Sequence, residues 1–381
     1  MQYIKLAIIF TLRIIFRAFH IFPVCENRIV FVSFMGKQFS CNPKYLFEYI
    51  YGKYGNKYRY VWCLNDKLLF SDKHKNIKIV KFISFKYVWH ILTSKFIITN
   101  NHVEPVFPFR KEQIIINTWH GGGAYKRISA LVSLYEKRRP YSTILRNIRA
   151  KLHNYYIIAA CEKFKNCIAE DWVMPTKKFL SIGMPRNDIL FSNNPCKEKV
   201  KSFYNLDHNI RIILYAPTYR GLPSRPDSIG LTLKIEDLLK NTKIKFNKDF
   251  ILLYRTHHDF NLNDNINGII TATNYPDMQE LLCAADILIT DYSSSMWDFS
   301  LTFKPCFLYA PDVKKYQDEQ EFYTPIEEWP FPLAKTNEQL MENIIKFDEE
   351  KYKQAVKKHH EDLGSYETGT ACEQFCNLVL K

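Results

Sequence analysis

Short apolar runs alternate with amphipathic stretches along most of the chain. The runs are rich in Ile, Val, Phe and Tyr, as in Ile114–Asn117 and Ile287–Thr290, and each stops at polar or turn-forming residues. Runs of this kind are typical of strands that are buried on both faces. Between them lie stretches with helical periodicity, such as Pro43–Tyr54, with proline in its first turn, and Ser84–Ser94, which opens on a capping serine. The alternation predicts parallel sheets covered by helices on both faces.

The predicted strands form two series, with a boundary near Gly183. The first series is expected at Arg28–Phe34, Tyr58–Leu64, Ile77–Phe82, Phe96–Thr99, Ile114–Asn117 and Tyr155–Ala160. The second opens with Phe179–Ile182, which leads into Gly183, and continues at Arg211–Ala216, Phe250–Tyr254, Ile287–Thr290 and Cys306–Tyr309. One hydrophobic core rarely serves a chain of 381 residues. The two series therefore predict two doubly wound α/β domains, over residues 23–182 and 183–381.

Residues 1–22 are interpreted as an amphipathic segment that lies on a membrane surface. The longest uncharged run, Leu6–Leu12, is far shorter than the ~20 residues of a membrane-spanning helix. Lys5, Arg13 and Arg17 have roughly helical spacing, so they can reach lipid headgroups while neighbouring Ile and Phe side chains enter the interface. The alternative is a helix that packs on its own domain.

Charge narrows the possible partners. The chain has 53 Lys and Arg against 39 Asp and Glu, a net charge of +14, which calls for an acidic partner: nucleic acid, anionic lipid or a phosphorylated substrate. Charge alone does not choose among them. The ten cysteines include no C-x-x-C pair, which favours a reducing compartment, and no metal site is expected.

Candidate chemistry follows the strands, because ligands of doubly wound sheets bind at the carboxyl ends of strands. His120 comes directly after Ile114–Asn117, and its imidazole can take a proton from a hydroxyl group. Gly121 and Gly122 let backbone approach a ligand, and Lys126 can meet a phosphate. The alternative is a glycine turn with a hydrogen-bonded structural histidine.

The second series offers further groups at strand ends. Arg255 and His257 follow one strand, where an Arg can bind phosphate in a bidentate fork. After Ile287–Thr290 come Asp291, Ser293 and Ser294, whose hydroxyl groups can bind phosphate or simply cap a helix.

Two other strand ends add cations and polar groups. Arg186 and Asn187 follow Gly183 at the domain boundary, and Thr218 and Arg220 follow Arg211–Ala216. A helix cap is the alternative for Arg186, Asn187 and the following Asp188, and a surface cation is the alternative for Arg220. The signatures of ATP-binding P-loops, dinucleotide-binding folds and G-x-S-x-G hydrolases are absent from the sequence. Basic and hydroxyl groups at strand ends suit a donor that carries a pyrophosphate.

At these residues the chain resembles the CDP-glycerol glycerophosphotransferase family, the teichoic acid primases and polymerases. The resemblance is carried by Phe34–Lys37, Cys41–Tyr45, Thr118–Gly121, Gly183–Asp188, Tyr215–Arg220, Arg255–His257, Thr290–Ser294 and Lys304–Pro305. There are two departures. Thr256 stands where the family usually has Pro, and the family often continues Trp-His-Gly with Thr-Pro-Leu-Lys, whereas this chain continues from Gly122 to Lys126 with Gly-Gly-Ala-Tyr-Lys.

The resemblance implies a GT-B fold, with two Rossmann-like domains facing a central cleft. It also implies attachment to the cytoplasmic face of the cell membrane, with donor binding mainly by the C-terminal domain. The transfer would take glycerol phosphate, or a related polyol phosphate, from CDP-glycerol or CDP-ribitol to an undecaprenyl-linked or polymeric acceptor in teichoic acid or capsule synthesis, and would release CMP. No further cofactor and no nucleic acid is expected.

The family's two essential histidines correspond to His120 and His257. We expect His120 to act as the base, and His257 and Arg255 to stabilise charge on the transferred phosphate. The other residues expected at the donor or its phosphates are Arg186, Asn187, Thr218, Arg220, Asp291, Ser293 and Ser294, and those expected near the acceptor are Gly121, Gly122 and Lys126. A GT-B glycosyltransferase that uses a nucleotide sugar is one alternative, and a non-catalytic basic protein that binds membrane or nucleic acid is another.

Overall fold

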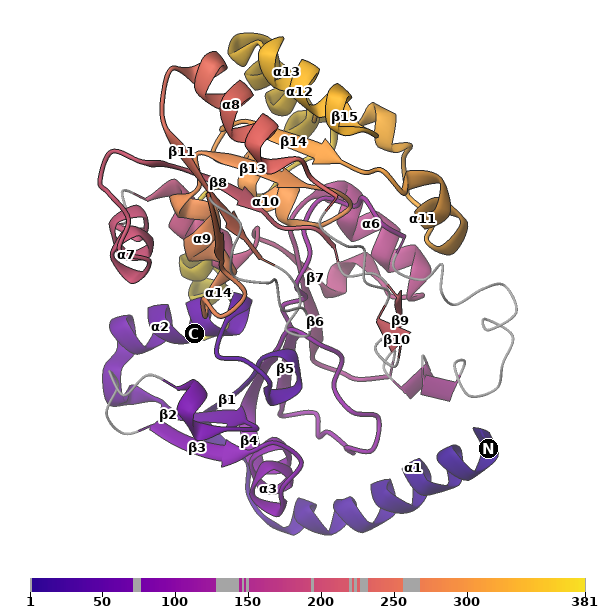
Figure 1. The fold of residues 1–381 in the computed structure, drawn as a ribbon. Helices are drawn as coiled ribbons and strands as arrows, with labels where there is room; N and C mark the ends of the chain where they lie inside the picture. The colour runs from indigo at the N-terminus through magenta and orange to yellow at the C-terminus, as the bar shows by residue number, and fades with distance from the viewer. Residues whose placement is uncertain are drawn as a thin grey trace. The chain divides into compact units, whose positions relative to one another are not determined.

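The computed structural model describes residues 2–70, 77–127, 144–145, 147–148, 151–192, 195–218, 221–222, 225–226, 232–255 and 268–380 (Figure 1). The chain divides into two compact units. Unit 1 consists of Met1–His120, Ile128–Asp188 and Tyr366–Lys381, and unit 2 of Gly121–Arg127 and Ile189–Ser365.

This division differs from the predicted domains, which were two consecutive ranges, residues 23–182 and 183–381. Residues 366–381 belong to unit 1, because helix α14 (Ala371–Val379) packs against helix α2 (Cys41–Tyr54). Gly121–Arg127 belongs to unit 2, because Arg127 donates its backbone N–H to the carbonyl of Glu321 at 2.9 Å. The chain thus passes into unit 2 twice, after His120 and after Asp188, whereas the sequence indicated one boundary near Gly183.

Unit 1 is built on a seven-stranded parallel sheet. Its strands are β1 (Cys25–Val32), β2 (Arg59–Leu64), β3 (Ile77–Lys81), β4 (Ser94–Thr99), β5 (Ile114–Asn117), β6 (Tyr155–Ala159) and β7 (Phe179–Ser181), in the order β3-β2-β1-β4-β5-β6-β7. The carboxyl-terminal halves of the central strands, Ile29–Val32 and Phe96–Thr99, are buried, and Trp62 packs against Phe31 with ring centroids 5.3 Å apart. Burial on both faces explains why these strands appear in the sequence as continuous apolar runs.

Unit 2 repeats the pattern with a six-stranded parallel sheet. Its strands are β8 (Arg211–Tyr215), β11 (Phe250–Tyr254), β12 (Ile269–Thr271), β13 (Ile287–Thr290), β14 (Cys306–Tyr309) and β15 (Leu333–Ala334), in the order β12-β11-β8-β13-β14-β15. A separate antiparallel pair joins β9 (Gly221–Leu222) to β10 (Arg225–Pro226).

Helices connect the parallel strands, as right-handed crossovers require. Besides α2 and α14, unit 1 contains α1 (Gln2–Phe16), α3 (Phe85–Thr93) and α6 (Glu162–Asp171). Unit 2 contains α7 (Cys196–Phe203), α8 (Ile235–Phe246), α9 (Met278–Ala284), α10 (Ser295–Ser300), α11 (Val313–Glu319), α12 (Asn337–Ile345) and α13 (Glu349–Asp362). The prediction of two doubly wound α/β units is confirmed, and so is the Ser84 cap, which accepts the N–H of Tyr87 at 3.2 Å.

Each sheet has one topological switch point, where the strand order reverses direction. It lies between β1 and β4 in unit 1, and between β8 and β13 in unit 2. Connections leave opposite faces of the sheet there, so the loops diverge and leave room for a ligand at the carboxyl ends of the two strands. The ligand-binding groups of each unit are therefore expected at these two points.

The N-terminal helix α1 presents two unlike faces. Leu6 and Ile9 are buried, whereas Ile4, Ile8 and Ile15 are more than half exposed. The expectation that Arg13 reaches lipid headgroups is wrong, because its guanidinium donates to the carbonyls of Pro105 and Phe107 at 2.6 and 2.9 Å. Within the described part of the chain, no helix combines the length and the apolar character that crossing a bilayer demands.

Candidate functional site

His120 lies at the switch point of unit 1. It follows β5, and its Nδ1 is 2.9 Å from the carbonyl oxygen of Asn100, which follows β4. Phe34, which follows β1, packs on the imidazole with ring centroids 5.6 Å apart, and Trp119 stacks on it at 4.5 Å. The loops after three neighbouring strands thus hold this side chain.

The contact with Asn100 determines the tautomer of His120. A carbonyl oxygen can only accept a hydrogen bond, so Nδ1 must carry the hydrogen. In the neutral ring, Nε2 is then the basic nitrogen, as a general base requires. The half-buried side chain keeps access to solvent.

Arg186 binds the same loop through its guanidinium. It is only 6% exposed, and its Nη1 donates to the carbonyl of His120 at 2.8 Å and contacts the Sγ of Cys41 at 3.2 Å. Its backbone N–H donates to the Oδ1 of Asn42 at 3.0 Å. The sequence predicts Arg186 at the donor phosphates, and that role stays a prediction. Its guanidinium binds the backbone that carries His120 and the side chain of Cys41.

Asn187 and Asp188 hold the C-terminal segment of the chain. Asn187 is completely buried and donates to the Oε1 of Glu367 at 3.0 Å, while Asp188 accepts the first two N–H groups of α14, from Ala371 and Cys372, at 2.9 and 2.8 Å. The helix-cap alternative therefore describes Asp188 correctly, although the helix that it caps lies far along the sequence. Burial raises the pKa of Asp188. Donor binding by Asn187 stays a prediction.

In unit 2, Thr218 and Asp291 meet at the switch point. The Oδ1 of Asp291 accepts the Thr218 backbone N–H at 2.8 Å and its hydroxyl at 2.6 Å, and also accepts the backbone N–H of Tyr292. Thr290 donates its hydroxyl to the carbonyl of Ala216 at 2.7 Å. The loop after β8 is thereby bound to the loop after β13, although the two are far apart in the sequence.

The serines after Asp291 lie at the start of α10. The Oγ of Ser293 accepts the N–H of Ser295 at 3.3 Å and its hydroxyl at 3.0 Å, whereas the side chain of Ser294, at the N-cap position, makes no capping bond. Both Ser293 and Ser294 are half-buried. Ser293 therefore binds the first turn of α10, and the hydroxyl of Ser294 lies beside it without a capping role.

Arg255 follows β11 and is firmly anchored. Its Nη1 donates to the carbonyls of Ala272 and Tyr275 at 3.2 and 2.7 Å, and burial lowers its pKa despite the nearby Asp277. One guanidinium nitrogen is thus used by the protein itself. The predicted fork on phosphate requires the other nitrogens of the group.

The glycine-rich continuation of the His120 loop is bound to unit 2. Gly122 lies against the indole of Trp297 in α10, so closely that a Cβ on this glycine would come within 2.1 Å of the Trp297 Cδ1. Tyr125 is buried and its hydroxyl is 3.0 Å from the Nε2 of His359, while Lys126 forms an antiparallel bridge with Phe322. Gly121 and Lys126 are half-buried.

Two predicted site residues, Arg220 and His257, lie outside the described residues. Two further residues that contact the His120 loop, Asn42 and Asn100, were not predicted from the sequence. Asn42 was noted only within a motif, and Asn100 follows a predicted strand but was not singled out. The carbonyl of Asn100, rather than its side chain, contacts His120, so residue type carries no signal there.

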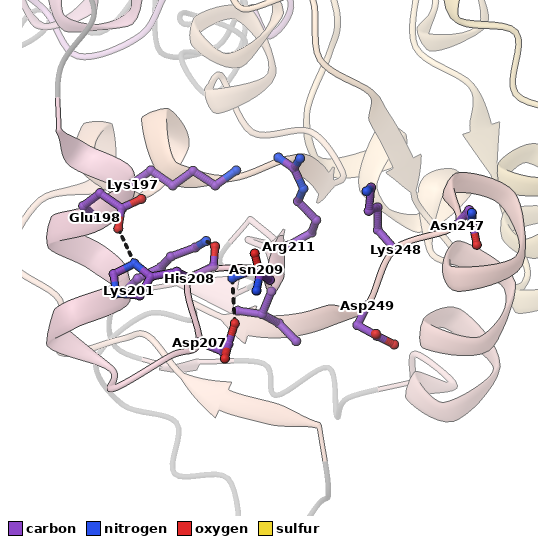
Figure 2. Close-up of a pocket in the computed structure, with 11 residues that line it drawn as sticks. Lys197, Glu198, Lys201, Asp207, His208, Asn209, Arg211, Asn247, Lys248 and Asp249 are labelled. Carbon is purple, nitrogen blue, oxygen red and sulfur yellow. Dashed lines mark hydrogen bonds and ion pairs between the residues drawn. The ribbon is translucent and has the colours of Figure 1, made fainter.

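A pocket of about 720 Å³ lies beyond the amino ends of strands β8 and β11 of unit 2, opposite the switch point. Figure 2 shows the residues that line it. It is lined by α7 and by the loops that precede β8 and β11, with Lys197, Lys201, Arg211 and Lys248 set against Glu198, Asp207 and Asp249. Lys197 and Arg211 both pair with Asp286, at 2.6 and 2.9 Å. The pocket is at the amino ends of the strands and its charges nearly cancel, so it does not resemble a pyrophosphate site.

The fold and the two switch points define a class of protein. Two doubly wound units, one with a histidine and one with hydroxyl and backbone groups beyond the carboxyl ends of the strands, are the arrangement of GT-B transferases that act on nucleotide-activated donors. Among the described residues, no cluster of His, Cys, Asp or Glu is arranged to hold a metal ion.

The comparison with known families identifies the chain more closely. Residues 14–381 match the model of the CDP-glycerol:poly(glycerophosphate) glycerophosphotransferase family, and the chain belongs to this family. It is thus a CDP-glycerol glycerophosphotransferase-like enzyme with a GT-B fold, as the resemblance in its motifs implied.

Curated relatives span most of the chain. A teichoic acid poly(glycerol phosphate) polymerase of Bacillus spizizenii is 28% identical over 379 residues, covering 96% of this chain and 95% of the relative. A teichoic acid ribitol-phosphate primase of the same organism is 25% identical, with 94% and 92% covered. The chain matches only 49% of the length of the corresponding Bacillus subtilis polymerase.

Solved structures agree with this assignment. A variant of the wall teichoic acid polymerase TagF, soaked with CDPG, superposes with a TM-score of 0.79 at 26% identity, covering 94% of this chain and 89% of that one. A second TagF variant gives a TM-score of 0.81 at 25% identity, covering 100% and 97%.

Proposed function

We propose that the protein transfers glycerol phosphate from CDP-glycerol to a lipid-linked or polymeric acceptor in the synthesis of teichoic acid or a related capsule polymer. The observation that carries the proposal is His120 at a switch point, with Nδ1 bound to a carbonyl and Nε2 as its basic nitrogen. Membership of the glycerophosphotransferase family supports the donor class, and one TagF relative was soaked with CDPG.

In the proposed reaction, an acceptor hydroxyl attacks the β-phosphorus of CDP-glycerol. The hydroxyl proton passes to the Nε2 of His120, a new P–O bond forms, and the bond to the bridging oxygen breaks, so that CMP leaves. Arg255 and His257 stabilise charge on the transferred phosphate, and Thr218, Ser293 and Ser294 bind the donor. Arg186, Asn187, Arg220 and Asp291 complete the proposed donor-side set, and Gly121, Gly122 and Lys126 face the acceptor.

Some proposed residues act by orientation. Asp291 is itself an anion, and its carboxylate accepts hydrogen bonds from Thr218, so its contribution is to hold the loop after β8 in place. Arg186 contributes in the same way through the carbonyl of His120. We assign acceptor binding mainly to unit 1 and donor binding mainly to unit 2. The exceptions are Gly121, Gly122 and Lys126, which belong to unit 2, and Arg186 and Asn187, which belong to unit 1.

We further propose that the enzyme works on the cytoplasmic face of the membrane as a peripheral protein. The net charge of +14 favours an anionic surface. The exposed isoleucines of α1 supply apolar contacts. The exposed side chains of Lys5, in α1, and Arg17, directly after it, supply cations. An undecaprenyl-linked acceptor would be located at this surface.

The test is CMP release by purified protein on acceptor membranes, with CDP-glycerol and CDP-ribitol supplied separately. We expect acceptor-dependent CMP release with one of them, and a loss of about 10²-fold or more in rate for His120→Ala, because a positioned base contributes that much. His360→Ala serves as a control for loss of an imidazole elsewhere. Absence of CMP with both donors, together with activity on a nucleotide sugar, would replace this function by glycosyl transfer.

A further inference from the structure

Asn42 joins three segments of unit 1 that are far apart in the sequence. It is completely buried at the start of α2, and its Nδ2 donates to the carbonyls of Thr118 and Trp119 at 3.2 and 3.0 Å. Its Oδ1 accepts the backbone N–H of Arg186 at 3.0 Å. One amide side chain therefore ties α2 to the loop that carries His120 and to the loop after β7.

These contacts reach the backbone on both sides of His120. The carbonyl of Trp119 belongs to the peptide bond that enters His120, and Asn42 binds it directly. The carbonyl of His120 belongs to the peptide bond that leaves it, and Arg186, whose own backbone is bound by Asn42, donates to it at 2.8 Å. Both peptide planes that set the direction of the imidazole are thus held, one directly and one through Arg186.

The backbone here needs such support. Trp119 has a φ of 52°, a left-handed conformation that is unfavourable for a bulky residue. Without the bonds from Asn42, the peptide groups around Trp119 would relax toward commoner conformations and the ring of His120 would turn with them. The contact of its Nδ1 with the carbonyl of Asn100, which defines the tautomer, depends on that direction.

Only an amide of this size meets the requirement. Two backbone carbonyls need donors and one backbone N–H needs an acceptor, and Asn supplies both from adjacent atoms. A carboxylate at this position would place an oxygen against two carbonyl oxygens. An alanine would leave all three backbone groups buried without this partner.

We propose that Asn42 is a positioning residue for His120, which acts by fixing the peptide groups before and after the base. The proposal rests on the proposed function, because it takes His120 as the base of the transfer. It assigns a role to a residue that touches neither the imidazole nor, by its complete burial, any substrate.

The chain provides a closely matched control. Gln113 is also buried in unit 1, its Nε2 donates to the carbonyls of Ile91 and Ser94 at 2.8 and 2.9 Å, and its Oε1 accepts the backbone N–H of Arg110 at 3.1 Å. This amide makes the same three kinds of bond as Asn42 without contacting the His120 loop. Gln113→Ala therefore reports the cost of losing a buried amide alone.

The kinetic experiment compares Asn42→Ala, Asn42→Asp and Gln113→Ala at equal concentrations of folded enzyme. We expect the two Asn42 variants to lose roughly 10- to 100-fold in kcat, since misplacement of a catalytic group by ~1 Å costs about that much. The KM for CDP-glycerol should stay within about twofold, as expected where an interaction acts only in the transition state. Gln113→Ala should lower Tm similarly and keep its kcat. Equal losses of kcat in the Asn42 and Gln113 variants would overturn the proposal.

A second experiment does not depend on turnover. In protein labelled with ¹⁵N-histidine, the imidazole signals of His120, assigned with His120→Gln, should show Nδ1 protonated and Nε2 unprotonated at neutral pH. Asn42→Asp should shift them toward a mixture of tautomers, and Gln113→Ala should leave them unchanged. Unchanged signals in Asn42→Asp would refute the positioning role, whereas absence of CMP release by the unmodified enzyme would refute the proposed function.

Discussion

At the scale of single residues, two aspartates frame the central strand β13 of unit 2. Asp286 precedes the strand and accepts the N–H of Ile212 at 2.9 Å, at the amino end of β8. Asp291 follows the strand and binds Thr218, beyond the carboxyl end of β8. The two carboxylates thus make comparable bonds at opposite edges of one sheet, and only the second lies at the switch point.

This pair allows a local test of donor binding. Asp291→Asn replaces a charged acceptor of hydrogen bonds from Thr218 and Tyr292, each worth about 1.5–3 kcal/mol, and should raise the donor KM by roughly tenfold while lowering Tm. Asp286→Asn should lower Tm without changing the donor KM. Steady-state kinetics and thermal unfolding of both variants provide the measurement, and a raised KM in Asp286→Asn alone would contradict the assignment of the donor edge.

Residue identity predicted part of this site and not the rest. His120, Thr218 and Asp291 were found because polar groups that follow apolar runs are visible in the sequence. Asn42 was not assigned a role, because its importance lies in bonds to backbone groups more than seventy residues away. Contacts of that kind depend on how the loops fold against one another, which no local pattern records.

At the scale of elements, α1 shows a buried and an exposed apolar face. Leu6, Ile9 and Arg13 follow the i, i+3, i+7 spacing of one helical stripe and contact unit 1, whereas Ile4, Ile8 and Ile15 lie on another stripe that is exposed. The sequence indicated either membrane binding or packing on the domain. In the structure, the face of α1 with Leu6 and Ile9 is packed. The face with Ile4, Ile8 and Ile15 is exposed and is the one that the proposal places at the membrane.

Membrane binding should therefore depend on the exposed stripe of α1. Ile8→Glu places a charge among apolar side chains that the proposal buries in lipid, so partition onto phosphatidylglycerol vesicles should fall by roughly tenfold, equivalent to ~1.4 kcal/mol. Ile244→Glu, at an exposed site of unit 2, is the matched control and should bind like the unmodified protein. Vesicle co-sedimentation gives both values. Equal binding by Ile8→Glu would remove α1 from the membrane contact.

Short strands were among the elements that the sequence did not predict. β12 has three residues and β15 has two, and both pair at or toward the edges of the unit 2 sheet. The central strands were predicted because burial on both faces demands continuous apolar runs. Edge strands of this length are defined by their neighbours rather than by their own composition.

At the scale of the whole molecule, buried histidines link stability to pH. Burial lowers the pKa of His90 in unit 1, and of His359 and His360 in unit 2, to about 4. An unfolded histidine has a pKa near 6.5, so between these values the unfolded chain binds more protons than the folded protein. Stability contributed by the neutral rings is complete above about pH 6.5 and is lost as the pH falls toward 4.

Urea unfolding at pH 7 and pH 5 should show this loss, at up to ~1.4 kcal/mol per pH unit for each such histidine. Glu104 and Asp188, whose pKa values are raised by burial, act in the opposite direction, so the informative quantity is a difference between proteins. His360→Gln should lose less stability than the unmodified protein over this interval. A pH dependence identical to that of the unmodified protein would show that His360 takes up its proton equally in the folded and unfolded states, which would contradict a pKa lowered by burial.

The interleaving of the chain between the two units has a consequence for biosynthesis. The sheet of unit 1 is complete once β7 has been synthesised. Helix α14 packs on α2, and its first N–H groups are bound by Asp188, but it follows the whole of Ile189–Ser365 in the sequence. Unit 1, which is synthesised first, therefore cannot bind α14 until unit 2 has been translated. During that interval the apolar side of α2 that α14 later covers is open to chaperones, and premature termination would leave it so permanently.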